Sequence, residues 1–361
     1  MAVHERFMRM ALGLAARGCG FVQPNPMVGA VLVKSDRIVG RGYHRVFGGP
    51  HAEIEALNKA GARARGADMY VTMEPCCFHG KTGACTEAIK AAGVRRVFAA
   101  MLDPHPKVRG RGMKCLQRAG IETHVGFLGD DARKLNEAYV RFHSRRRPFV
   151  VLKLALSLDG MVATSSGESK WITGPEAREY GQKLRQSADT ILVGLDTVLS
   201  DNPRLDCRMP RRQGLLKVVL DPELRTPPTS RFLKTKGRSL ILTTKAGEGR
   251  KEVLQKHGAE VVGITPGKNG LFGWKRILAE LRRREVVSLL IEGGATVAAS
   301  ALDDGVVDKV CLFHAPKVIG PGRSFGMKMK PRSLRRALVL KDLERKVMGQ
   351  DVMTEGYVLR K

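Results

Sequence analysis

Four residues in the N-terminal half have the types and spacing suited to metal-assisted hydrolysis. His51-Ala52-Glu53 is followed 22 residues later by Pro75-Cys76, and Cys85 lies nine residues beyond Cys76. One imidazole and two thiolates can hold a zinc ion with its fourth position open to a water molecule, whose pKa then falls to about 7. A carboxylate two residues from the histidine is placed to carry a proton. We therefore predict hydrolytic deamination, with His51, Cys76 and Cys85 as ligands and Glu53 as the catalytic residue.

The second part of this motif has unusual spacing. Zinc base deaminases have Pro-Cys-x2-Cys, whereas eight residues separate Cys76 from Cys85 here. Cys77 is not expected to be a ligand, because neighbouring side chains on an extended segment point apart. If Pro75-Cys76 opens a helix, Cys85 can return to the metal across the loop 79–83. The alternative is two buried structural cysteines beside an incidental His-x-Glu.

The elements that must position these residues alternate between strands and helices. Apolar runs predict strands at 28–34, 38–40, 69–73 and 96–101, and helical spacing predicts helices at 52–62 and 86–92. The charged, proline-ended stretch 144–148 predicts a boundary near residue 146, giving domains 1–146 and 147–361. Alternation then resumes, which indicates an α/β protein with crossover helices. Strands are predicted at 149–156, 189–194, 216–220, 239–243, 259–264 and 286–291, and helices at 272–284 and 295–303.

Composition narrows the functional classes. The chain has 361 residues, 43% of them hydrophobic, and a net charge of +28. No run approaches the ~18 uncharged apolar residues that cross a bilayer, and the N-terminus reads as an amphipathic helix, so we expect a cytoplasmic protein with no membrane partner. Seven cysteines do not indicate a disulfide framework. The positive charge fits nucleic-acid or anionic-substrate binding, but a solvated basic surface is the favoured interpretation.

Several other residues could bind ligands. Asn25 stands between two prolines that fix its backbone, so its amide could read a ring or sugar, although a plain turn is equally consistent. Gly293-Gly294 follows a predicted strand and precedes a helix, where backbone N–H groups can approach a phosphate, or where the chain simply turns. Lys153 could hold a phosphate or a ribose hydroxyl, and Arg185 and Arg208 could pair with a phosphate, or all three could be solvated.

Motifs along the whole chain resemble one family, the bifunctional riboflavin-biosynthesis deaminase/reductase of bacteria and plants. The first half carries the resemblance in Pro24-Asn25-Pro26-Met27-Val28-Gly29-Ala30-Val31, His51-Ala52-Glu53, Glu74-Pro75-Cys76, Gly80-Lys81-Thr82, Cys85, Asp103-Pro104 and Lys107-Val108. The second half continues it, in the family's order. It does so in Lys153-Leu154-Ala155-Leu156-Ser157-Leu158-Asp159-Gly160, Gly167-Glu168-Ser169-Lys170-Trp171-Ile172-Thr173, Asp201-Asn202-Pro203, Arg208 and Glu292-Gly293-Gly294.

This resemblance implies both fold and chemistry. It implies an N-terminal cytidine-deaminase-like three-layer domain and a C-terminal dihydrofolate-reductase-like domain. The first would use one zinc ion per chain to deaminate a phosphoribosylamino-diaminopyrimidine, and the second would reduce the ribosyl group to ribityl with NADPH, in a homo-oligomer without nucleic acid. The implied NADPH-contacting residues are Ala155, Trp171, Thr197 and Asp201, joined by Gly293 and Gly294. The implied substrate-contacting residues are Ser169, Arg185, Leu205, Arg208 and Glu292, joined by Asn25 and Lys153.

The chain departs from the family pattern in the loop between the two cysteines. The family reads Pro-Cys-[Ser/Asn]-His-x-Gly-[Lys/Arg]-Thr-Pro-Pro-Cys, whereas here Phe78 precedes His79 and Gly83-Ala84 replaces two prolines. We expect a looser loop that still permits metal binding. Three hypotheses follow: a bifunctional enzyme, a nucleic-acid deaminase, and a chain in which only one half is active.

Overall fold

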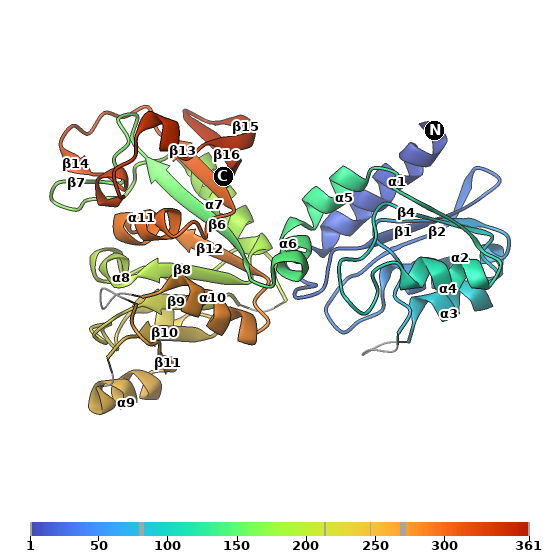
Figure 1. The fold of residues 1–361 in the computed structure, drawn as a ribbon, viewed down its shortest axis with the longest axis horizontal. Coiled ribbons are helices and arrows are strands. Elements are labelled where there is room, and N and C mark those ends of the chain that lie inside the picture. The colour runs from blue at the N-terminus through green and yellow to red at the C-terminus, as the bar shows by residue number, and fades with distance from the viewer. Residues whose placement is uncertain (1, 79–82, 213, 246, 268–271, 360–361) are drawn as a thin grey trace. The chain divides into compact units, whose positions relative to one another are not determined.

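The computed structural model describes residues 2–78, 83–212, 214–245, 247–267 and 272–359. It divides into two compact units, Met1–Arg146 and Arg147–Lys361, which are treated one at a time (Figure 1). Among the residues described, no helix is long and apolar enough to span a membrane.

Unit 1 is a three-layer α/β/α domain built on a five-stranded sheet. The strands lie in the order β2-β1-β3-β4-β5. Strand β1 is antiparallel to both β2 and β3, whereas β3, β4 and β5 are parallel. The elements are α1 (Ala2–Ala15), η1 (Ala16–Gly18), β1 (Gly29–Lys34), β2 (Arg37–Tyr43), α2 (Ala52–Ala60), η2 (Gly61–Ala64), β3 (Asp68–Val71), α3 (Cys85–Ala91), β4 (Arg96–Ala99), α4 (Arg111–Arg118), β5 (Glu122–Val125), α5 (Gly129–Leu135) and α6 (Glu137–Arg145).

Helices α2, α3 and α4 pack on one face of this sheet. Small residues of α2, such as Ala56, join Leu32, Val97 and Leu116 in one apolar core. Helix α2 lies close to the sheet because Gly42 has no side chain, and a Cβ there would meet the Ala52 carbonyl oxygen at 2.6 Å. This close packing fixes the N-terminus of α2, which is where the chemistry-bearing histidine stands.

Unit 2 is built on a nine-stranded sheet. Its strand order is β11-β10-β9-β8-β12-β6-β13-β16-β15. All strands from β11 at one edge to β13 are parallel to one another. Strands β16 and β15 are added antiparallel at the other edge. The elements are β6 (Phe149–Leu156), β7 (Ala163–Thr164), α7 (Pro175–Ser187), β8 (Thr190–Gly194), α8 (Leu195–Asp201), β9 (Leu216–Leu220), η3 (Arg231–Lys234), β10 (Ser239–Thr243), α9 (Glu248–Lys256), β11 (Ala259–Gly263), α10 (Trp274–Arg283), β12 (Ser288–Glu292), α11 (Ala295–Asp303), β13 (Lys309–His314), β14 (Gly322–Arg323), η4 (Gly326–Lys328), η5 (Leu334–Arg336), β15 (Leu340–Met348) and β16 (Asp351–Val358).

Both faces of this second sheet are covered, as parallel strands require. Trp274 and Leu278 of α10 and Leu302 of α11 pack against one face, in the core that contains Leu152 and Leu154. Leu254 of α9 packs in a separate core on the opposite face. Strand β6 alternates between buried and half-buried residues, because its Leu152 and Leu154 enter the α10–α11 core while the residues between them point to the other face.

The predicted α/β class is confirmed. One local expectation is wrong. No helix opens at Pro75-Cys76: the chain there has no regular structure, and α3 instead begins at Cys85. Glu74 explains the difference, because its carboxylate accepts hydrogen bonds from the backbone N–H groups of Asp103, Gly110 and Gly112 and so ties this segment to another loop. The expected loosening of loop 79–83 concerns mainly residues 79–82, which lie outside the described part of the chain.

Candidate functional sites

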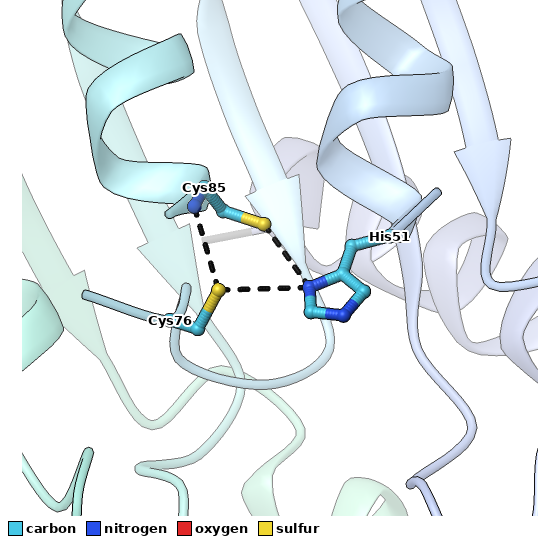
Figure 2. Close-up of side chains that lie close together, drawn as sticks. All are labelled: His51, Cys76 and Cys85. Carbon is cyan, nitrogen blue, oxygen red and sulfur yellow. Dashed lines mark hydrogen bonds between the residues drawn. The ribbon is translucent and has the colours of Figure 1, made fainter. Parts of the chain in front are cut away.

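Three side chains of unit 1 point toward a common centre (Figure 2). The Nδ1 atom of His51 lies 3.2 Å from the Sγ of Cys85 and 3.6 Å from the Sγ of Cys76. All three potential ligand atoms lie within 4.8 Å of one another. His51 is the N-cap of α2 and Cys85 is the first residue of α3, so two helix N-termini meet at this centre.

This arrangement fits a zinc ion. Ligands at zinc distances of 2.0–2.3 Å, arranged tetrahedrally, lie about 3.5–3.8 Å apart, close to the separations of 3.2 and 3.6 Å. The donor set of one nitrogen and two sulfurs supplies three positions, which leaves a fourth for water. The residues therefore match a catalytic site in which one position stays open.

The ionisable groups at this centre change one another's pKa values. The contact with Cys85 lowers the pKa of Cys76 to about 4, and the same contact raises the pKa of Cys85. The hydrogen bond to Cys76 raises the pKa of His51. Glu53 lies in α2 and is 3% exposed, and burial raises its pKa to about 7. A carboxyl group with that pKa can hold or release a proton at neutral pH.

The Asn25 side chain connects to this centre through a histidine that sequence reasoning missed. Its Nδ2 lies 3.2 Å from the Nε2 of His44, and the His44 ring stands 5.3 Å from the His51 ring. The Nδ1 of His44 lies 3.0 Å from the Pro50 carbonyl oxygen, so Nδ1 donates and Nε2 accepts from Asn25. Burial lowers the pKa of His44, which favours this neutral form. No motif around His44 in the sequence indicated that it would orient Asn25.

A buried acid borders the same site. Asp103 is 8% exposed and accepts hydrogen bonds from the Tyr139 hydroxyl at 3.1 Å and the His105 backbone N–H at 2.8 Å. Burial raises the pKa of Asp103 to about 6, and the charge of Cys76 contributes to that rise. The Asp103-Pro104 motif therefore lies within electrostatic reach of the predicted ligands.

In unit 2, three predicted substrate residues lie together. Arg185 of α7 makes a two-pronged ion pair with Glu292 at the end of β12, with both N–O distances 2.8 Å. Lys153 on β6 is the register partner of Glu292. The charge of Arg185 and the charge of Lys153 both lower the pKa of Glu292, against the opposing effect of burial.

The predicted cofactor residues form two local groups. Gly293 and Gly294 have φ of +85° and +77°, and a Cβ on either would lie 3.6 or 3.4 Å from Thr197. These glycines lead into α11, for which Gly294 is the N-cap. Separately, the Ser169 hydroxyl donates to Asp201 at 3.0 Å, so a predicted substrate residue touches a predicted cofactor residue.

The remaining predicted residues have more varied settings. Ala155 is half-buried and pairs in register with Phe313. Trp171 is 63% exposed, with the Arg178 guanidinium 4.8 Å from its ring centre. Leu205 is buried at φ +50°. Arg208 is exposed, and its backbone N–H donates to Gln182. Leu205 packs in a core, so any ligand contact there falls to its backbone.

Comparisons with protein families confirm both predicted domain types. Residues 1–101 match the family described as the cytidine and deoxycytidylate deaminase zinc-binding region. Residues 148–354 match the RibD C-terminal domain. The first match includes His51, Glu53, Cys76 and Cys85.

Individual relatives match over nearly the full length. The riboflavin biosynthesis protein RibD of Aquifex aeolicus is 40% identical over 352 residues, which is 97% of each chain. RibD of Escherichia coli is 39% identical over 329 residues, 88% of each chain. Among solved structures, Acinetobacter baumannii RibD superimposes with a TM-score of 0.90 at 34% identity, covering 99% of both chains. A diaminohydroxyphosphoribosylaminopyrimidine deaminase/5-amino-6-(5-phosphoribosylamino)uracil reductase of Thermotoga maritima gives a TM-score of 0.87 at 33% identity, also covering 99% of both chains.

Proposed function

This chain belongs to the RibD family of bifunctional riboflavin-biosynthesis enzymes, and from that premise we propose which of its residues carry out each reaction. The family has a zinc-binding deaminase domain and a reductase domain, and both are present here. The substrate proposed for the first reaction is 2,5-diamino-6-(5-phosphoribosylamino)pyrimidin-4(3H)-one. The product would then be reduced at its ribosyl group to the ribityl compound.

For deamination, we propose that His51, Cys76 and Cys85 hold one zinc ion. When bound, zinc supplies a hydroxide at neutral pH by lowering the pKa of a coordinated water. Glu53 holds a proton on its carboxyl group and delivers it to the departing amine. The observation that carries this proposal is the convergence of the three ligand atoms within 4.8 Å, beside a carboxyl group that is 3% exposed.

For substrate selection in the same domain, we propose that Asn25 contacts the pyrimidine ring. Its support is the hydrogen bond to His44, which holds the amide in one orientation next to the metal ligands. An oriented amide presents a fixed donor and acceptor, as recognition of a heterocycle requires.

For reduction, we propose that NADPH supplies a hydride and that this chain's residues orient the two partners. Gly293, Gly294 and Thr197 approach the cofactor phosphates, since glycines allow close backbone contact at the N-terminus of α11, and Ala155, Trp171 and Asp201 complete its binding. Lys153 and Glu292 hold the ribosyl group of the substrate, with Arg185 fixing Glu292. Ser169, Leu205 and Arg208 hold the rest of the substrate.

A two-step assay tests the proposal. The zinc-loaded chain is incubated with the diaminopyrimidine phosphate, first without NADPH and then with it. We expect ammonia release in the first step and cofactor oxidation in the second, with NADH compared in parallel. Absence of both reactions in protein that contains zinc would contradict the proposal.

A nucleic-acid deaminase receives no support from these observations. That hypothesis leaves unexplained residues 148–354, which match the RibD C-terminal domain. Reduction without deamination would instead support the hypothesis of a single active half, and zinc analysis of the same sample would show whether the altered loop is the reason.

We also propose that the chain works in the cytoplasm as a homo-oligomer. The support is its resemblance to enzymes of small-molecule biosynthesis. Sedimentation at micromolar protein concentration gives the mass of the assembly, and a monomer would contradict this part of the proposal.

A further inference from the structure

Four side chains of unit 2 stand in one row across its sheet. Glu292 of β12 pairs in register with Lys153 of β6, Lys153 pairs with Cys311 of β13, and Cys311 pairs with Glu355 of β16. Register partners on neighbouring strands project to the same face, about 4.8 Å apart. The row therefore places a second carboxylate about 10 Å from the Lys153 backbone, on the side opposite Glu292.

The far end of this row is sealed from water. Cys311 is 0% exposed and Glu355 is 6% exposed. Helix α7 covers this face through Ala177, which shares an apolar cluster with Cys311 and Phe313. Charges embedded in such surroundings interact more strongly than charges in water.

Cys311 is an uncharged spacer in the row. Burial, followed by the charge of Glu355, raises the pKa of its thiol to about 12. The Nζ of Lys153 lies 5.6 Å from the centre of the Phe313 ring, and its side chain passes under Gly181 of α7, where a Cβ would contact Cε at 4.0 Å. The lysine therefore lies between a ring and a helix, on the strand next to Cys311.

Several charged or titratable groups stand on the elements around this lysine. Arg185 of α7 neutralises Glu292, and Lys309 of β13 lies 3.1 Å from a Glu355 oxygen. On β15, Glu344 is the register partner of Glu355, and the Nζ of Lys346 lies 5.9 Å from the ring of Tyr180 on α7. Within this set, Glu355 is the acid reached from Lys153 by crossing only the neutral Cys311.

We propose that Glu355, acting across the buried Cys311 thiol, is a positioning residue for the Lys153 ammonium group during ribosyl reduction. This inference rests on the proposed contact between Lys153 and the substrate. A negative charge fixed in the sheet attracts the ammonium group of a nearby lysine, and Lys309 opposes that attraction because it is the ion-pair partner of Glu355. Glu355 and Lys309 should therefore have opposite electrostatic effects on the ammonium group of Lys153.

The test is the pH dependence of kcat for reduction of the deaminated substrate at saturating NADPH. The basic limb of this profile reports the loss of a proton from the enzyme–substrate complex. Removing the negative charge with Glu355→Gln should shift the basic limb to lower pH by about 0.5–1 pH unit. Removing the positive charge with Lys309→Met should shift it to higher pH by a similar amount. A folding defect does not produce opposite shifts.

The matched control is Glu344→Gln, which removes the same type of carboxylate one strand farther from Lys153. Its basic limb should stay within about 0.2 pH unit of the parent, because charges farther away are weaker and better screened. Far-UV circular dichroism checks that each variant folds. If Glu355→Gln does not fold, Lys309→Met decides alone: an upward shift supports the inference and any other result overturns it.

The remaining outcomes separate this inference from the proposed function. Opposite shifts with an unmoved control support it. Unmoved limbs in both variants, or shifts in the same direction, overturn it. Lys153→Met tests the premise independently, and reduction that persists within tenfold of the parent in that variant would contradict the proposed substrate contact itself.

Discussion

The two candidate sites are assembled in different ways. In unit 1, the three proposed metal ligands lie between residues 51 and 85, and two of them, His51 and Cys85, stand at the starts of helices. In unit 2, the central ion pair joins Arg185 to Glu292, 107 positions apart in sequence. The first site is therefore a compact motif in the chain, whereas the second exists only because α7 packs on the sheet and brings Arg185 to the end of β12.

They also differ in how charge is balanced. Unit 2 neutralises its buried carboxylate with a guanidinium that lies 2.8 Å away. Unit 1 instead gathers a histidine, two thiols and a buried carboxyl group whose pKa is about 7, a set whose charge a divalent cation can balance. The comparison teaches that unit 2 supplies the counter-charge of its buried carboxylate from its own side chains, whereas the proposed zinc site of unit 1 would take its counter-charge from a bound cation.

The largest expected effect tests whether the two sites are independent. Glu53→Gln removes the proposed proton carrier, so deamination should fall by about 10²–10⁴-fold, while reduction of supplied deaminated product stays unchanged. The measurement is ammonia release and NADPH oxidation in separate assays. Glu55→Gln is the matched control on the same helix, because Glu55 pairs with Arg45 at 3.2 Å instead of lying at the metal centre. Loss of both activities in Glu53→Gln would contradict the independence of the two sites.

The next effect tests charge balance in unit 2. Arg185→Met leaves the buried Glu292 without its ion-pair partner, which should destabilise unit 2 by about 3–5 kcal/mol and abolish reduction, with deamination retained. Urea denaturation followed by circular dichroism measures the stability. Arg283→Met is the control, since the exposed Arg283 pairs with Glu280 at 2.8 Å and its loss should change stability by less than about 1 kcal/mol. Equal effects of the two substitutions would contradict the prediction.

A smaller effect tests the buried acid of unit 1. The pKa of Asp103 is raised to about 6, so its protonated form is favoured in the folded state. Its contribution to stability is present below the unfolded pKa near 4 and is lost as pH rises through about 6. Asp103→Asn stays neutral, so its free energy of unfolding should exceed that of the parent by about 3 kcal/mol at pH 8 and equal it at pH 4.

Denaturation at those two pH values checks the Asp103 prediction. In unit 2, Asp308→Asn should do the opposite and destabilise the protein at pH 8, because Asp308 accepts from the Arg147 guanidinium at 2.7 Å. Destabilisation by both substitutions at pH 8 would show that the two units bury their acids in the same way.

The smallest expected effect concerns the hydroxyl that reaches Asp103. Tyr139→Phe removes a donor at 3.1 Å and should lower the free energy of unfolding by about 1 kcal/mol. Combined with Asp103→Ala, which removes the acceptor, the effects should be non-additive, because the two groups share one hydrogen bond. A double-mutant cycle at pH 7 measures the coupling, and strict additivity would argue against a direct interaction.

Much of the fold was predictable from the sequence. Apolar runs indicated β1, β3, β4 and β6, because a strand buried on both faces must be apolar throughout. The last two strands of the chain, β16 and the edge strand β15, were not predicted, since charged residues interrupt them and β15 is mostly exposed. Helix α7 was also missed, because its buried residues, Ala177 among them, are few among many charged ones.

The sequence by itself determined which residues are proposed to hold zinc and carry the proton, because a histidine, a glutamate and two cysteines of fixed type and spacing are a local property of the chain. Tertiary structure alone decided that the helix starts at Cys85 and not at Cys76, that His44 orients Asn25, and that Cys311 and Glu355 stand in line with Lys153. Those relations depend on packing and strand register, which join residues that no local pattern connects.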